Sequence, residues 1–235
     1  AIERLARVPV EAEIASEYRY RDPIVGENEL FIAVSQSGET ADTLAALREA
    51  KRRGARVMAI CNVVGSTITR EAGEENPLYT YAGPEIAVAS TKAYITQAEL
   101  MVMLAVALAD LRGQISPERA AQLMEGLADL PRKAEQALAV EEQLQRLTSM
   151  LSQKRHVFFV GRGMDYALSM EAALKLKEVS YIFSEAYAAG ELKHGPIALL
   201  KEGRLVVATL TQPALLEKTM SNLREVAARG AQVVA

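Results

Sequence analysis

The chain carries an internal duplication, and this feature constrains its fold more than any other. The segment from Leu47 to Ala59 matches the segment from Leu223 to Ala235 at eight of thirteen positions. The match extends upstream, because the apolar runs at 30–33 and 205–208 lie at nearly the same offset. Each copy predicts the order helix, strand, loop, strand, helix, glycine, strand. This alternation builds a parallel sheet with helices on both faces.

We therefore expect an α/β fold of two tandem lobes related by duplication, each a parallel sheet flanked by helices in three αβα layers. The first lobe covers residues 1–115 and the second covers residues 154–235. Residues 116–153, between them, are charged, rich in alanine and leucine, and interrupted by Pro117 and Pro131. This composition predicts helices that link the two lobes.

The two copies differ at their ends. The second copy includes an apolar strand at 157–160, whose counterpart in the first copy would precede Ala1. The second copy stops at Ala235, where the first continues to a strand near 78–80 and a long helix. We therefore expect a fragment of a larger polypeptide. Its first lobe would lack the first strand, and its second lobe would lack the last segments.

Composition narrows the class of function. The 30 acidic and 27 basic residues are mixed along the chain, so no basic stripe favours nucleic acid and no polybasic face favours a membrane. Cys61 is the only cysteine and the two histidines show no ligand spacing, so we expect no metal site and a cytoplasmic location. The apolar stretch near 100–108 is too short to cross a bilayer and predicts a buried helix. A small molecule is the expected partner.

The first candidate site is a hydroxyl-rich turn that contains Ser35, Gln36, Ser37 and Thr40. It lies between an apolar run and an amphipathic stretch. Short hydrogen-bonding side chains and the free N–H groups of a helix N-terminus favour a phosphate oxyanion. The alternative is that Ser37 or Thr40 only caps the helix. The same turn in the second copy, at 210–214, has lost most hydroxyls. The fold does not require them, and we therefore favour the ligand site.

A row of charged residues is the second candidate. Glu171, Lys175 and Glu178 are spaced i, i+4, i+7, so they share one helix face. Such a row is usually a solvated ladder of ion pairs. His194 follows among small and charged residues, where a histidine can titrate near neutrality and act as an acid or base. Ser90 and Thr91 open a long helix, where a capping role for either residue is the simpler interpretation.

Four motifs, in chain order, together resemble the isomerase half of the glucosamine-6-phosphate synthase family. They are Ser35-Gln36-Ser37-Gly38-Glu39-Thr40-Ala41-Asp42-Thr43, Val88-Ala89-Ser90-Thr91-Lys92-Ala93, Ala173-Leu174-Lys175-Leu176-Lys177-Glu178, and Glu185-Ala186-Tyr187 through Gly195-Pro196. The resemblance covers nearly the whole chain. It implies tandem sugar-isomerase (SIS) lobes, fructose-6-phosphate as substrate, glucosamine-6-phosphate as product, and no cofactor.

The resemblance also implies roles for individual residues. The side chains implied on the phosphate are Ser35, Gln36, Ser37 and Thr40, and those implied near the sugar are Val88 and Ser90. Glu178 would be the base that moves a proton between C1 and C2, with Glu171 and Lys175 in support. A single base within reach of both carbons suffices for this transfer. His194 would help open the sugar ring from the partner subunit of a homodimer.

Some family features are not found in this chain. These are the N-terminal glutaminase domain with its cysteine nucleophile, an upstream Cys-Gly-Thr-Ser turn and a C-terminal lysine tail, so we expect no product synthesis by the fragment alone. Residues 72–81 and Ala87 also depart from the family pattern. Two other hypotheses stay open. One is a stand-alone sugar-phosphate isomerase or deglycase. The other is a non-catalytic sugar-phosphate-binding module, in which Glu178 and His194 can be replaced without loss of any reaction.

Overall fold

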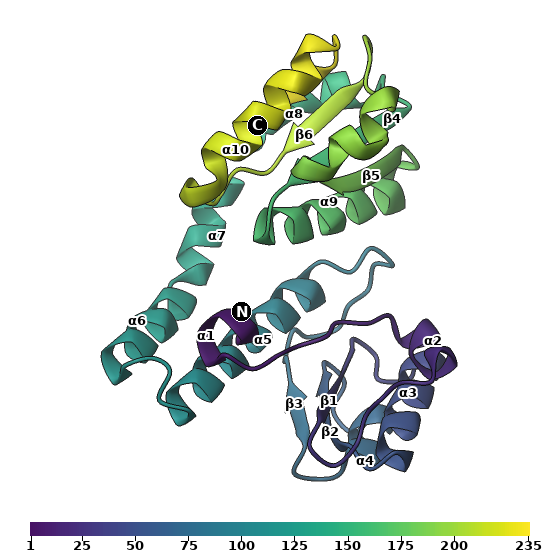
Figure 1. Cartoon of the computed structure of the whole chain (residues 1–235), viewed down its shortest axis with the longest axis vertical. Coiled ribbons are helices and arrows are strands. Elements are labelled where there is room, and N and C mark those ends of the chain that lie inside the picture. Colours follow the sequence, from purple (N-terminus) through teal and green to yellow (C-terminus); the bar gives the residue numbers. More distant parts are fainter. The chain divides into compact units, whose positions relative to one another are not determined.

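The computed structural model describes residues 1–235, with the side chains of all but residues 143, 146 and 150. The chain divides into two compact units, Ala1–Lys133 and Ala134–Ala235 (Figure 1). The division falls inside the segment 116–153 for which linking helices are predicted. That segment is helical, and its helices are α6 (Pro117–Ala128), α7 (Leu130–Leu138) and α8 (Glu141–Leu151).

A parallel sheet of three strands, in the order β1-β2-β3, organises the first unit (Figure 1). The strands are β1 (Leu30–Ser35), β2 (Arg56–Cys61) and β3 (Pro77–Tyr79). Two helices, α3 (Ala41–Arg52) and α4 (Thr67–Ala72), pack on this sheet. Their buried residues Leu47 and Ile68 join Ala59 of β2 in one apolar core. Burial of these apolar side chains is the main force that fixes the helices to the strands.

The long helix predicted at the end of the first lobe is α5 (Lys92–Leu111). Its buried residues Ala105 and Ala109 pack with Ile2 and Ala6 of α1 (Ile2–Ala6). The sequence predicts a buried helix here, but the structure buries only one face, and Met103 is exposed. The apolar stretch near 100–108 is too short to cross a bilayer, but the whole of α5, with 20 residues, could do so by length and composition alone; 17% of its most apolar window is buried. The unit is completed by α2 (Ala15–Tyr18) and the 3-10 helix η1 (Arg19–Arg21).

Four parallel strands in the order β5-β4-β6-β7 form the sheet of the second unit. They are β4 (His156–Gly161), β5 (Phe183–Ala188), β6 (Leu205–Ala208) and β7 (Gln232–Val234). The helical elements around them are α9 (Met164–Ser180), η2 (Ala189–His194), η3 (Pro196–Leu199) and α10 (Pro213–Ala228). Successive side chains of a strand point to opposite faces. Accordingly Phe159 packs with Ala173 of α9, whereas Phe158 lies in the core that contains Leu223 of α10.

The topology confirms the α/β fold class and shows the duplication. In both units a strand, a helix and a neighbouring parallel strand follow one another, as β1-α3-β2 and as β6-α10-β7. The repeated sequence segments therefore form the same helix end, glycine turn and strand start in each copy. The strand expected near 78–80 is β3, and the one expected at 157–160 is β4.

Candidate functional site

The carboxyl ends of β1, β2 and β3 meet at one edge of the first sheet. Ser35 pairs with Cys61, and Cys61 pairs with Tyr79, so the three strands end in register. Two connections leave this edge: the hydroxyl turn (residues 35–40) and the β3–α5 loop (residues 80–91). Open parallel sheets bind ligands outside the carboxyl ends of their strands. The predicted phosphate and sugar contacts of the first unit therefore start from one sheet edge.

Hydrogen bonds inside the hydroxyl turn fix its shape. The Oγ atom of Ser35, which is buried, accepts a hydrogen bond from the Gly38 N–H at 2.9 Å. The Ser37 Oγ atom accepts from the Glu39 N–H at 3.3 Å. Thr40 is the N-cap residue of α3, but its side chain makes no capping hydrogen bond. The capping alternative is therefore wrong for both Ser37 and Thr40.

The turn also presents donors that the protein itself does not use. Among the described residues, the backbone N–H groups of Ala41, Asp42 and Thr43 at the start of α3 donate to no acceptor. In the same part of the structure, the Gln36 amide and the Thr40 hydroxyl have no partner. Free N–H groups at a helix N-terminus carry partial positive charge and bind anions. Together these groups can hold a phosphate oxyanion.

Helix α4 supports the turn from the other side. The Gly38 carbonyl accepts from the Ile68 N–H at 3.0 Å, and the Glu39 Oε1 atom accepts from the Thr67 N–H at 2.8 Å. The backbone hydrogen bond from Thr67 lowers the pKa of Glu39. The only carboxylate in the hydroxyl turn is thus engaged at the N-terminus of α4. Gly38 has φ +70°, and an added Cβ would lie 2.2 Å from the Ser66 Oγ atom, so only glycine fits there.

The β3–α5 loop contains the two residues implied near the sugar. Val88 is 96% exposed. The Ser90 hydroxyl donates to the Glu85 carboxylate at 3.2 Å, and the same carboxylate accepts from the Ala93 N–H at 3.2 Å. Burial raises the pKa of Glu85, but these hydrogen bonds outweigh burial and lower it. The Glu85 side chain therefore caps α5. Thr91 is the N-cap residue but its side chain makes no capping hydrogen bond, so the expectation of a capping role for Ser90 or Thr91 is wrong.

The charged residues Glu171, Lys175 and Glu178 of α9 are joined by ion pairs, as their spacing predicts. The Lys175 Nζ atom lies 2.6 Å from the Glu178 carboxylate and 3.5 Å from the Glu171 carboxylate. The three side chains are only 22–27% exposed, so they do not form a fully solvated ladder. Burial lowers the pKa of Lys175, but the hydrogen bond from Lys175 to Glu178 and both carboxylate charges raise it overall. The lysine is therefore a fixed cation between two carboxylates.

His194 is not brought to this row within the unit. It is exposed and ends the 3-10 helix η2. The residues Ala189 and Leu192 of η2 pack in the core on the α10 face of the sheet. Ala173 of α9 packs in the core on the opposite face. His194 and Glu178 thus belong to elements on opposite faces of the second sheet.

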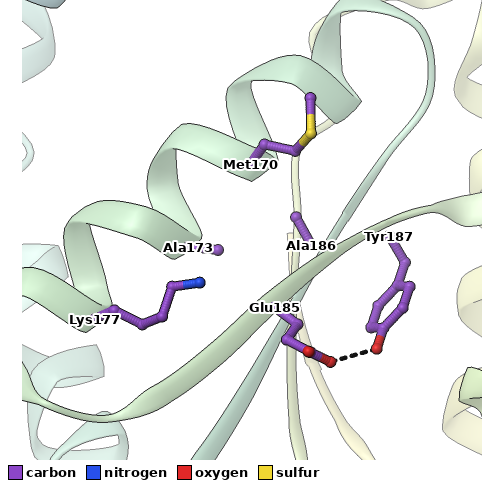
Figure 2. A pocket seen from close by; sticks show the side chains of 6 residues that line it. All are labelled: Met170, Ala173, Lys177, Glu185, Ala186 and Tyr187. Carbon is purple, nitrogen blue, oxygen red and sulfur yellow. Dashed lines mark hydrogen bonds between the residues drawn. The ribbon is translucent and has the colours of Figure 1, made fainter. Parts of the chain in front are cut away.

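A pocket of about 250 Å³ lies between α9 and β5, but it contains none of the predicted site residues (Figure 2). Its lining residues are Met170, Ala173, Lys177, Glu185, Ala186 and Tyr187. The Tyr187 hydroxyl donates to the Glu185 carboxylate, which raises the pKa of Tyr187 to about 12. Lys177 lies on a different face of α9 from Lys175. The pocket is therefore separate from the charged row.

The turn after β6, which corresponds to the hydroxyl turn, is occupied by the chain itself. Asp165 is 3% exposed, and its carboxylate accepts from the Thr211 N–H at 3.0 Å and from the Thr211 hydroxyl. The Gln212 side chain donates to the Arg162 carbonyl at 2.7 Å. A carboxylate of the protein thus takes the anion position in the second copy, which spacing alone did not predict. Among the described residues, no cluster of three or more His, Cys, Asp or Glu side chains could hold a metal ion.

The fold agrees with that of the proteins to which this chain is similar. The family model of the SIS domain matches residues 1–107 and 150–235. A glutamine–fructose-6-phosphate aminotransferase (isomerizing) from Symbiobacterium thermophilum is 60% identical over 233 residues, which are 99% of this chain and 38% of that protein. The chain thus spans about two fifths of the length of the curated relatives it matches.

Two solved structures are also similar. One is the C-terminal domain of glucosamine-fructose-6-phosphate aminotransferase from Francisella tularensis, with 44% identity and a TM-score of 0.95. That match covers 99% of this chain and 65% of that chain. The other is a glucosamine-6-phosphate deaminase from Thermotoga maritima, with 27% identity and a TM-score of 0.74, covering 99% of this chain and 68% of that chain.

Proposed function

This chain belongs to the SIS domain family, and on that premise we infer that it is the isomerase part of a glutamine–fructose-6-phosphate aminotransferase. Identity of 60% across 99% of the chain supports this assignment over that of a deaminase, for which the identity is 27%. In this proposal, fructose-6-phosphate and ammonia give glucosamine-6-phosphate. A glutaminase domain outside this chain would release the ammonia from glutamine. The mixed charge and single cysteine of this chain support a cytoplasmic protein without nucleic-acid or membrane partners.

The observation that carries the proposal is the hydroxyl turn with its unused donors. Gln36, Ser37 and Thr40 present an amide and two hydroxyls beside the free N–H groups of α3. No lysine or arginine lies in the turn, so a phosphate monoester would be bound by neutral hydrogen bonds and the helix N-terminus. Ser35 would act through the hydrogen bond that shapes the turn. Val88 and Ser90 of the β3–α5 loop would lie near the sugar.

Replacing Ser37 or Thr40 by alanine is expected to weaken fructose-6-phosphate binding by roughly 1–3 kcal/mol. Each change removes a hydrogen bond to a charged group. Calorimetric titration with fructose-6-phosphate and with fructose measures the effect, and the unphosphorylated sugar should bind poorly to all variants. Ser116→Ala is the control, because its hydroxyl accepts from Arg119 N–H in α6 and not in the turn. Unchanged affinity in both turn variants would remove the turn as the phosphate site.

The chemistry of isomerisation is assigned to the charged row. Once ammonia has replaced the C2 oxygen as an imine, a base must take a proton from C1 and return it to C2. The Glu178 carboxylate can do both, because one group within reach of adjacent carbons shuttles the proton on one face of the planar intermediate. Lys175, held by Glu171 and Glu178, fixes the position of that carboxylate. Neither transfer needs a metal or a redox cofactor.

We further propose that the protein is a homodimer in which His194 serves the site of the partner subunit and helps to open the sugar ring. Support comes from the placement of η2 and α9 on opposite faces of the second sheet. Co-expression of Glu178→Gln and His194→Ala chains is expected to restore about a quarter of the wild-type activity, because half the dimers hold one intact site. Each variant alone should be nearly inactive. Co-expressed chains that stay as inactive as the single variants would contradict the shared site.

A further inference from the structure

We propose that Asn62 is a positioning residue that holds the β3–α5 loop at a fixed place relative to the hydroxyl turn, an inference that rests on the proposed function. The first residues beyond β1, β2 and β3 are Gln36, Asn62 and Thr80. Because the strands end in register, these three residues lie side by side at the sheet edge. Asn62 follows the central strand and therefore stands between the two connections.

The backbone of Asn62 binds the hydroxyl turn. Its N–H donates to the Gln36 carbonyl at 3.2 Å. The Cys61 Sγ atom lies 3.5 Å from the same carbonyl. These contacts continue the β1–β2 pairing past the last strand residue. The start of the hydroxyl turn is therefore tied to the end of β2, whatever side chain stands at position 62.

The side chain of Asn62 binds the β3–α5 loop with both ends of its amide. The Oδ1 atom accepts from the Ala82 N–H at 2.8 Å and from the Thr80 hydroxyl at 3.1 Å. The Nδ2 atom donates to the Gly83 carbonyl at 2.7 Å. Of the side chains of this size, only asparagine offers an acceptor and a donor in this arrangement. Three residues of the loop, Thr80, Ala82 and Gly83, are thus bound by one half-buried amide.

The three hydrogen bonds of the Asn62 side chain are called the clamp from here on. The backbone conformation of Tyr81 shows why the loop needs this clamp. Tyr81 has φ 50°, in the left-handed region, although its side chain is 77% exposed. A non-glycine residue pays about 1–2 kcal/mol for this conformation. The Asn62 bonds to Thr80 and Ala82 lie on either side of it. Residues in such conformations persist when surrounding contacts determine them, and they concentrate at functional sites.

Loss of the clamp should affect binding of the sugar more than binding of the phosphate. Without the amide, residues 80–83 can relax, and the path of the loop to Val88 and Ser90 changes. The hydroxyl turn keeps its own hydrogen bonds, its support from α4 and the Asn62 backbone contact. The ratio of fructose-6-phosphate affinity to inorganic-phosphate affinity reports the proposed role, whereas a general loss of stability would lower both.

The experiment compares Asn62→Ala with wild type in competitive titrations of the longer protein that contains this chain, using fructose-6-phosphate and inorganic phosphate as probes. We expect the fructose-6-phosphate affinity to fall about 10-fold and the phosphate affinity to change by less than about 2-fold. Asn62→Asp should lose at least as much, because it sets a carboxylate oxygen against the Gly83 carbonyl. The matched control is Asn76→Ala, since the Asn76 amide donates only to the Ala72 carbonyl, away from both connections. This control should keep wild-type affinity for both probes.

The outcomes separate the inference from the proposed function. A wild-type chain that fails to bind fructose-6-phosphate contradicts the proposed function. A wild-type chain that binds it, with Asn62→Ala binding equally well, overturns the role of Asn62. Equal losses for both probes also overturn it, because they place the effect on the turn. If Asn62→Ala is unfolded at the assay temperature, Thr80→Val decides: it removes one of the three bonds and should reduce fructose-6-phosphate affinity selectively, by about 2- to 3-fold.

Discussion

Replacing Glu178 by glutamine is expected to lower isomerisation by about 10²-fold or more while sugar-phosphate binding stays close to wild type. Glutamine keeps the shape of the side chain and can still accept a hydrogen bond from Lys175, which lies 2.6 Å from the carboxylate. It cannot accept the proton from C1. The measurement is turnover, together with solvent hydrogen exchange at C1, in the longer protein that contains this chain.

Glu171→Gln is the matched control for this prediction. Glu171 is the more distant partner of Lys175, at 3.5 Å, and its loss leaves the contact between Lys175 and Glu178 in place. We therefore expect a loss of less than about 10-fold, caused by a change in charge around the base. Equal losses in the two variants, or exchange at C1 that persists in Glu178→Gln, would contradict the assignment of the base. The non-catalytic binding hypothesis predicts no loss in either variant.

Gly38→Ala should destabilise the first unit by roughly 3 kcal/mol and abolish measurable fructose-6-phosphate binding. Two costs add at this position. The residue has φ +70°, which an alanine adopts only with strain, and its Cβ would lie 2.2 Å from Ser66 Oγ and 2.9 Å from Cys61 Sγ. The buried hydroxyl and thiol sit behind the turn, so the turn must move away from α4. Urea denaturation and calorimetric titration measure the two effects.

Gly65→Ala is the control that separates the two costs at Gly38, the positive φ angle and the close contact with Ser66 and Cys61. Gly65 has φ +72°, almost the same as Gly38, but no atom lies within 4 Å of an added Cβ. Its substitution should cost only about 1 kcal/mol and leave binding intact. If the two alanine variants lose the same stability and the same affinity, then close packing of the turn on α4 has no functional role.

The elements that the sequence predicts best are those whose signal is local. The apolar runs that become β1 and β4 and the duplicated segment around Leu47 are continuous in sequence. The i, i+4, i+7 spacing also correctly places Glu171, Lys175 and Glu178 in contact, because helix geometry alone decides it. The roles assigned to these residues stay predictions, as do the lobe boundaries.

Features that depend on distant contacts could not be predicted from the sequence. Capping of α5 falls to Glu85 and not to Ser90, because the loop folds back and brings the carboxylate to the Ala93 N–H. The three hydrogen bonds of the Asn62 amide join residues 18 to 21 positions apart, and no periodic pattern in the sequence predicts them. Likewise, the apolar composition of α5 does not indicate that only one of its faces is buried. Each of these depends on which elements become neighbours after folding.

Because the Asp165 carboxylate binds the turn after β6, the two copies differ in how their turns would respond to the concentration of a dissolved anion. In the proposed function the anion at the hydroxyl turn comes from solution, so its occupancy would rise and fall with the amount of sugar phosphate. At the second turn the anion is part of the chain and stays bound at every concentration. Under that proposal, duplication leaves one exchangeable anion position and one permanent one. The stability of the first unit would then depend on the supply of its ligand, whereas in the second copy the Asp165 carboxylate fills the corresponding position.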